Sequence, residues 1–199
     1  MSGIIAQNTL DNSGLIKSPA GGGAWNFISK QTASADATID FTSGIDSTYK
    51  LYIFKFFNIN AATNVAEFGF QANASGESGY NETMQTTYYL AYHNTTDTNS
   101  GLDYSAAFDL NGGTGIQTLA QDVGSGAYEN TNGTLFVFNP SSTVFSTQFY
   151  SRSTTLNGDD YACDAFASGY FSTTAALTNF TFKFSTGNIT AGTVKMYGL

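Results

Sequence analysis

Phe180-Thr181-Phe182-Lys183-Phe184 places three phenylalanines on alternate residues near the end of the chain. Because successive side chains of a β-strand point to opposite faces, this period of two predicts a strand with one dry face and one wet face. Similar alternation recurs in short segments separated by clusters of Gly, Asn, Ser and Thr. The sequence therefore predicts an all-β protein with hardly any helix, a jelly-roll-like antiparallel β-sandwich.

The alternation from Trp25 onward divides the chain into a series of expected strands. Segment 48–59 has apolar residues on both faces, so we expect it between layers or at a subunit contact. The expected strands lie near residues 25–32, 37–42, 48–59, 64–72, 83–93, 104–109, 133–139, 144–152, 161–172, 177–185 and 192–198.

Residues 1–24 differ from the rest of the chain. Their apolar residues follow no clean period, and Lys17 to Ala24 form a Gly-rich hinge. We therefore expect an N-terminal arm, residues 1–24, joined to one β-sandwich domain, residues 25–199. The arm is expected to contact another subunit. Its candidate contact residues are Ile4, Ile5, Leu10, Leu15, Ile16, Pro19 and Trp25.

The charge of the chain excludes two classes of partner. The net charge is −8, and the seven basic residues are scattered along the sequence. Such a chain repels a phosphate backbone and an anionic membrane surface, so we expect neither nucleic-acid binding nor membrane docking. It has no apolar run long enough to span a bilayer and no recognisable signal peptide, which predicts folding in a cytoplasm.

Residues that could carry a reaction are few. His93 is the single histidine and lies where a strand gives way to a polar loop, so we interpret it as an exposed hydrogen-bonding group. Asp159, Asp160 and Asp164 crowd around a Gly turn, where a solvated turn is favoured over a calcium site. Cys163 has no cation beside it in sequence and suits a small buried side chain. We expect no catalytic residue, cofactor or metal.

Tyrosines gather in the middle of the chain. Tyr88, Tyr89, Tyr92 and Tyr104 could stack on sugar rings, as in lectin-like sandwiches. Packing in the core or between the subunits of a trimer uses aromatic residues equally well, so the pattern leaves glycan contact and packing open.

Several stretches together resemble a family of virion structural proteins from marine tailed bacteriophages. The resemblance spans most of the chain, whereas residues 60–130 are similar mainly in composition. It implies a β-sandwich virion component of the decoration or fibre type, with no catalytic residues to carry over. The stretches that carry it are Ser2 to Thr9, Lys17 to Trp25, Asp46 to Phe56, Phe138 to Thr143, Gly169 to Thr174 and Gly192 to Leu199.

Two functional hypotheses of different class follow from the residues and the resemblance. In the first, the protein is a capsid decoration or cement protein on the outer surface of a virion. It would be a homotrimer that binds the major capsid protein through its arm and subunit contacts. In the second, it is the outer module of a tail fibre or head spike that binds a host surface glycan. A glycan-cleaving enzyme is a third and weaker interpretation.

Overall fold

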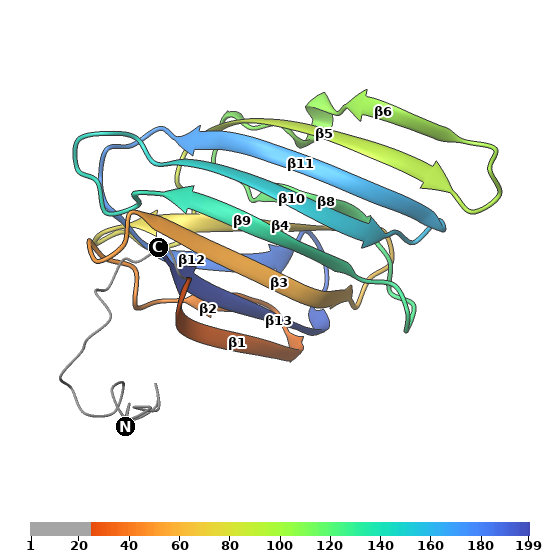
Figure 1. Ribbon diagram of the computed structural model, residues 1–199, viewed down its shortest axis with the longest axis horizontal. Coiled ribbons are helices and arrows are strands. Elements are labelled where there is room, and N and C mark those ends of the chain that lie inside the picture. The colour runs from red at the N-terminus through yellow and green to blue at the C-terminus, as the bar shows by residue number, and fades with distance from the viewer. Residues whose placement is uncertain (1–24) are drawn as a thin grey trace, which may run out of the picture.

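Two antiparallel sheets packed face to face make up the computed structural model of the protein, which describes residues 25–199 (Figure 1). The larger sheet has nine strands in the order β1-β13-β3-β9-β10-β11-β5-β6, and β7 also pairs with β5. The smaller sheet has the order β2-β12-β4-β8. The predicted antiparallel β-sandwich is confirmed, and its jelly-roll connectivity stays a prediction.

The strands follow one another with short connections. Their bounds are β1 Asn26–Asp36, β2 Ile39–Phe41, β3 Leu51–Ala61, β4 Ala66–Ala74, β5 Met84–Asn94, β6 Ser100–Tyr104, β7 Asn111–Gly113, β8 Gln117–Val123, β9 Thr131–Phe138, β10 Gln148–Leu156, β11 Tyr161–Phe171, β12 Leu177–Phe184 and β13 Ile189–Gly198. One short 3-10 helix, η1, spans Ala106–Phe108. Within residues 25–199, no helix is long and apolar enough to cross a membrane.

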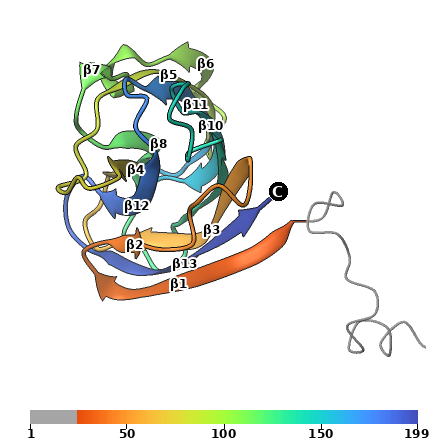
Figure 2. The same cartoon turned by 90° about the vertical axis from the view of Figure 1, so that its left-hand side faces the viewer.

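The larger sheet curves around the smaller one (Figure 2). Seen end-on, it runs from β1 at the bottom to β6 at the top, and β12, β4 and β8 lie in its hollow. Because nine strands face only four, the larger sheet extends beyond β8, the edge strand of the smaller sheet. The inner faces of β5 and β6 therefore overhang that edge.

The core between the sheets is built from phenylalanine rings. Strand β12 shows the predicted dry face, because Phe180, Phe182 and Phe184 are buried. On its other face Lys183 is exposed as predicted, whereas Thr181 is buried. The ring of Phe182 lies 5.3 Å from that of Phe54 on the opposite sheet, measured between centroids. Burial of such large rings from both layers holds the sandwich together.

Strand β3 is central to the larger sheet and apolar on both sides. Tyr52, Phe54 and Phe56 are buried and belong to the core. Ile53 points to the other side of the sheet but is also fully buried. It lies between Tyr197 of β13 and Phe136 of β9, its partners in register. The smaller sheet therefore covers only the inner side of this segment, and the predicted alternative, a subunit contact, stays a prediction for its outer side.

Two expected strands differ from the structure, and the structure has a strand that was not expected. Residues 104–109 hold the end of β6 and helix η1 rather than a strand of their own. Strand β8 was not expected, because Gln117 to Val123 has few β-branched or aromatic residues. Residues 144–147 precede β10 in a turn, where the Ser142 hydroxyl accepts hydrogen bonds from the amides of Val144 and Phe145.

The predicted assembly arm lies outside the described residues. Its predicted contact residues there are Ile4, Ile5, Leu10, Leu15, Ile16 and Pro19. Trp25, the last residue of that set, immediately precedes β1 and is 44% exposed.

Candidate functional site: an aromatic face and a polar cleft

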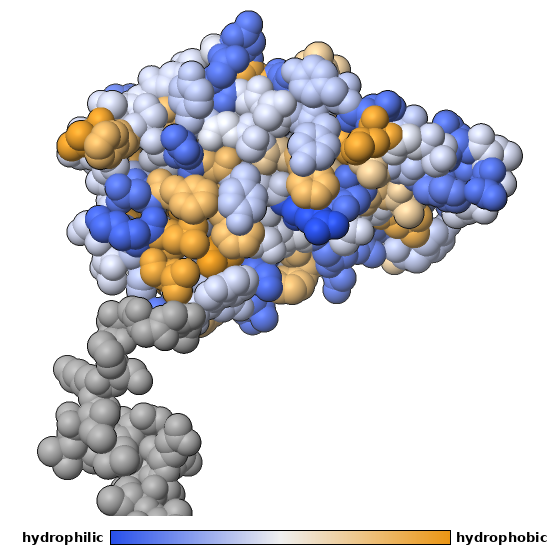
Figure 3. All heavy atoms as spheres, turned by 45° about the horizontal axis from the view of Figure 1, so that its top comes forward, coloured by the Kyte–Doolittle hydropathy of each residue, from blue (hydrophilic) through white to orange (hydrophobic). Residues whose placement is uncertain are grey.

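The solvent side of the larger sheet, here called the outer face, carries rows of aromatic side chains. One row runs across five strands in register, from Phe27 through Tyr197 and Ile53 to Phe136 and Tyr150. Figure 3, which looks onto this side of the molecule, shows orange apolar patches between paler residues. A soluble sheet usually turns polar residues to its solvent side, so this row requires an explanation.

The aromatic rings of the outer face are organised in contacting pairs. Phe136 and Tyr150 stack with their centroids 4.7 Å apart and their planes at 19°. Tyr89 and Phe166 stack at 4.9 Å and 7°. Tyr197 has a T-shaped contact with Phe27 at 5.7 Å. Such ring pairs restrict each other's movement, so these side chains are preorganised for contact with a partner.

A second row on the outer face gathers basic side chains that are far apart in the sequence. Lys30, Lys195 and Lys55 are register partners on adjacent strands β1, β13 and β3. Arg152 of β10 continues the row, with one intervening residue on β9. Although the basic residues are scattered along the sequence, the fold brings four of the six in 25–199 onto one face.

Three cations of this row, Lys55, Lys195 and Arg152, lie over aromatic rings. The Lys55 ammonium lies 4.6 Å from the ring centroid of Trp25, and the Arg152 guanidinium lies 5.1 Å from that of Phe166. Arg152 also donates to both carboxylate oxygens of Asp164, at 2.9 and 2.7 Å, and these bonds raise the pKa of Arg152. Strands β13, β3, β9, β10, β11 and β5 contain no other acid. From β13 to β5, the outer face is thus locally basic on an acidic protein.

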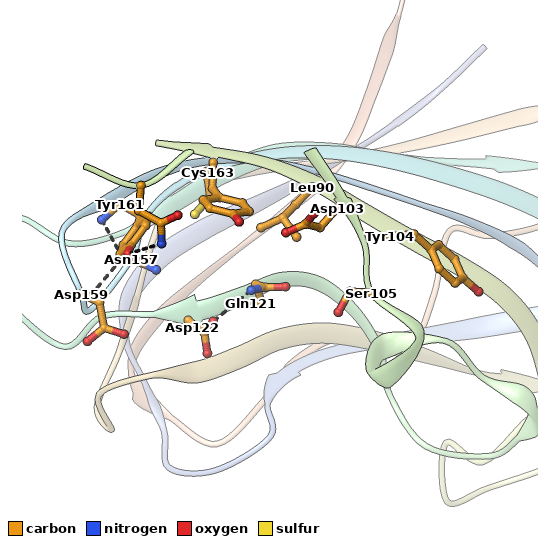
Figure 4. A pocket seen from close by; sticks show the side chains of 12 residues that line it. Leu90, Asp103, Tyr104, Ser105, Gln121, Asp122, Asn157, Asp159, Tyr161 and Cys163 are labelled. Atoms are coloured by element: carbon orange, nitrogen blue, oxygen red, sulfur yellow. Dashed lines mark hydrogen bonds between the residues drawn. The ribbon is translucent and has the colours of Figure 1, made fainter. Parts of the chain in front are cut away.

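A cleft lies on the other side of the larger sheet, where β5, β6 and β11 overhang β8. Its volume is about 530 Å³. In Figure 4, the side chains of Gln121 and Asp122 come from β8 below, and Leu90 and Cys163 come from the larger sheet above. The remaining lining residues are Tyr92, Asn99, Asp103, Tyr104, Ser105, Asn157, Asp159 and Tyr161.

The cleft is rich in acidic and amide groups. Burial is the main cause that raises the pKa of Asp122, and the charges of Glu67 and Asp159 add to it. Burial also raises the pKa of the Cys163 thiol to about 11, which agrees with its predicted role as a buried, unreactive side chain. Asn99 donates to the Tyr161 hydroxyl at 3.0 Å. The cleft therefore offers hydrogen-bond acceptors and no basic side chain among these lining residues.

The four tyrosines predicted for glycan contact do not form one site. Tyr88 is fully buried beneath the sheet, so its ring is not available to a glycan. Tyr89 and Tyr104 are register partners on the outer face, and in Figure 4 the Tyr104 ring points away from the other cleft residues. Tyr92 alone of the four turns its ring to the cleft, beside Tyr161 at 5.9 Å.

The predicted reactive residues are dispersed. His93 is 54% exposed and lies 2.9 Å from a carboxylate oxygen of Asp97 near the tip of the β5–β6 hairpin, consistent with an exposed hydrogen-bonding group. Asp159 lines the cleft, whereas Asp164 binds Arg152 on the opposite face. Across residues 25–199, no cluster of three His, Cys, Asp or Glu side chains is arranged to hold a metal ion.

Several cleft residues were not predicted from the sequence, among them Asp103, Gln121, Asp122 and Tyr161. They come from three strands, and only the fold brings them together. A signal was present at Gln121 and Asp122, where two adjacent polar residues interrupt a buried segment. Such an interruption marks a β-bulge rather than the end of a strand.

No family model, curated protein or solved structure matches the chain.

Proposed function

We propose that the protein is a non-enzymatic assembly protein that attaches to a larger structure through the outer face of its nine-stranded sheet. The observation that carries the proposal is the pairing of exposed aromatic rows with a basic row on that face. Aromatic residues and arginine are the types most enriched in protein interfaces. The partner surface should supply carboxylates for Lys30, Lys55 and Lys195, which lie in a row with no acid opposite them.

The identity proposed for the larger structure is a virus particle. The resemblance to virion structural proteins of marine tailed bacteriophages supports it, and the β-sandwich is consistent with it. The protein would be made in the host cytoplasm and would act on the outer surface as a capsid decoration protein. It would bind the major capsid protein, as a homotrimer, with residues 1–24 as a second attachment. Trp25 belongs to the outer face through its contacts with Tyr197 and Lys55, so this segment joins the domain at the proposed interface.

The number of copies per particle tests the decoration role. Hundreds of copies, measured by quantitative mass spectrometry of purified particles, are expected because decoration proteins follow the symmetry of the shell. A chain lacking residues 1–24 should remain folded but attach to shells more weakly. Native mass spectrometry of the full chain tests the homotrimer. A few copies per particle would contradict the decoration role.

Paired tyrosine variants test the outer face itself. Tyr150→Ala removes an exposed ring from the β10 end of the aromatic row and should weaken attachment to shells about 10-fold or more, as for an interface anchor. Tyr128→Ala removes an equally large exposed ring from the loop after β8 and serves as the matched control. Equal attachment of both variants would overturn the proposed interface.

A second candidate function is the outer module of a tail fibre or head spike that binds a host glycan. The cleft favours this second function, because the Tyr92 and Tyr161 rings line it together with amide and carboxylate groups. Sugar sites in proteins combine such rings with planar polar side chains. A low copy number together with binding of the isolated protein to host cells would favour this function over decoration.

A further inference from the structure

The cleft contains a local irregularity that aims polar side chains into it. Strand β8 pairs with β4 at Ala66↔Val123 and again at Phe68↔Ala120, so β8 has one more residue than its partner between these pairs. Adjacent residues of a regular strand point to opposite sides. At this bulge both Gln121 and Asp122 line the cleft.

The backbone conformation of Asp122 at the bulge is energetically unfavourable. Asp122 has φ +53°, in the left-handed region that is uncommon for side chains other than glycine, although Asp and Asn tolerate it best. Bulges and residues of this kind concentrate at ligand sites, where the surrounding fold holds them in place. The bulge thus does not end the strand. It directs the Asp122 side chain into the cleft.

One polar atom at the bulge lacks a partner. The Gln121 side chain donates from Nε2 to Oδ2 of Asp122 at 3.0 Å, which orients the amide. Its Oε1 is buried and accepts no hydrogen bond within the described part of the chain. A buried acceptor without a donor is costly, and a ligand hydroxyl would satisfy it.

The other walls of the cleft restrict the ligand to a donor with an apolar side. Asp103 and Asp159 add acceptors, and the Tyr92 and Tyr161 rings supply flat apolar surface. No basic side chain is among the lining residues, so an anionic ligand would be repelled. A pyranose ring has hydroxyl donors at its rim and C–H groups on its faces, which match both kinds of wall.

We propose that this cleft binds a neutral saccharide, with its hydroxyl groups on Gln121 Oε1 and the Asp122 carboxylate and a ring face against Tyr92 and Tyr161. The inference rests on the second candidate function for its ligand class, and it names the site and the charge of the ligand. It is independent of attachment through the outer face, because the cleft lies on the opposite side of the larger sheet.

The test is binding of the full chain to an array of neutral hexose and N-acetylhexosamine oligosaccharides, matched uronic-acid oligosaccharides, and a polyamine. Neutral oligosaccharides should bind, and the uronic acids should bind at least 10-fold more weakly. Asp122→Asn should reduce binding of the neutral ligand about 10-fold, because a charged acceptor is lost. Glu77→Gln changes the charge equally on an exposed loop and should bind as the unmodified chain does.

The outcomes separate the site from the function. Binding of neutral sugars that Asp122→Asn leaves unchanged would overturn the proposed site while keeping glycan recognition. Absence of any sugar binding at millimolar concentration would overturn both, as would preferential binding of the polyamine. Asparagine tolerates the left-handed backbone at position 122, so lost binding with an unchanged or raised melting temperature supports the site rather than a folding defect.

Discussion

Two serines on β10 show how a single hydroxyl can stabilise or destabilise the fold. Ser151 and Ser153 face the core, and each side chain is 1% exposed. The Ser153 hydroxyl donates to the Leu119 carbonyl of β8 at 2.6 Å and so links the two sheets. The Ser151 hydroxyl is buried without a partner in the described structure. Because a buried unpaired hydroxyl is costly, the two positions should respond oppositely to alanine.

We predict that Ser151→Ala raises the free energy of unfolding by about 1 kcal/mol and that Ser153→Ala lowers it by about 1 kcal/mol. Urea denaturation of the two variants and the unmodified chain measures both changes under identical conditions. The pair is internally controlled, because strand, side-chain type and burial are the same. Loss of stability in both variants would show that the Ser151 hydroxyl is satisfied in solution.

Asp122 should make stability depend on pH. Its pKa is raised by burial, so the folded protein holds this proton more tightly than the unfolded chain does. Protonation therefore stabilises the fold below pH 4, and this contribution is lost as the pH rises through the raised pKa. At pH 7, Asp122→Asn should melt up to about 3 °C higher than the unmodified chain. At pH 3, where Asp122 is protonated, the two should have the same melting temperature, as followed by circular dichroism.

Asp46 provides the contrary case. Hydrogen bonds from Thr48 lower its pKa, so its contribution is present at neutral pH and lost on acidification. Asp46→Asn should therefore melt lower than the unmodified chain at pH 7, the reverse of the change at position 122. Shifts of the same sign for both variants would contradict the assignment for Asp122.

Strand β12 is the element on which the packing of the two sheets depends most. Phe182 contacts rings from both layers, including Phe54 at 5.3 Å and Phe41 at 6.1 Å. We predict that Phe182→Ala lowers the free energy of unfolding by about 3–5 kcal/mol, through lost burial and the cavity left behind. Lys183→Ala on the same strand should change it by less than about 0.5 kcal/mol, because that side chain is exposed.

Denaturant unfolding of the β12 variants provides the measurement, and Phe182→Leu is a milder substitution if the alanine variant does not fold. A cost for Phe182→Ala below about 1 kcal/mol would mean that the core repacks around the gap, contrary to the expectation for rings held from both layers.

The hydrophobic periodicity of the sequence predicted the strands that bury one face or both faces. The alternation of β12 and the two apolar faces of β3 were readable because each residue's environment follows from its place along one strand. Strand β8 was not readable, because Gln117 and Thr118 are polar and yet buried, and its bulges break the alternation. Local sequence does not contain the information that decides these cases.

The candidate sites depend on which strands pair and in which register, and this could not be predicted from the sequence. Lys30, Lys55 and Lys195 are neighbours only because β1 and β3 both pair with β13. The cleft exists only because the larger sheet extends beyond the smaller. Sequence reasoning found Tyr92, but its neighbours in space come from β6, β8 and β11.

On the scale of the whole molecule, the basic row should make attachment sensitive to salt. The double variant Lys55→Gln, Lys195→Gln retains most of the side-chain length but removes two positive charges from the outer face. Its rate of association with shells should fall about 10-fold at low ionic strength, and the difference should shrink in high salt as the charges are screened. Stopped-flow or surface-plasmon measurements follow this rate directly.

Lys183→Gln is the matched control for the salt experiment. Lys183 lies on β12 of the smaller sheet, away from the basic row, so its loss changes the net charge without altering the outer face. An equal fall in rate for the double variant and this control would assign the effect to overall charge and contradict an oriented approach through the outer face.

The borders of the nine-stranded sheet decide whether copies of the protein can pair edge to edge. A bare strand at a sheet border invites another chain to pair with it and to grow an endless ribbon. Here β1 has a bulge between Phe27 and Ser29 followed by Lys30, and β6 is only five residues long and contains Asp103. These are the features by which natural sheets block lateral polymerisation, so copies should not polymerise through their edges, while their broad surfaces stay free to engage a partner.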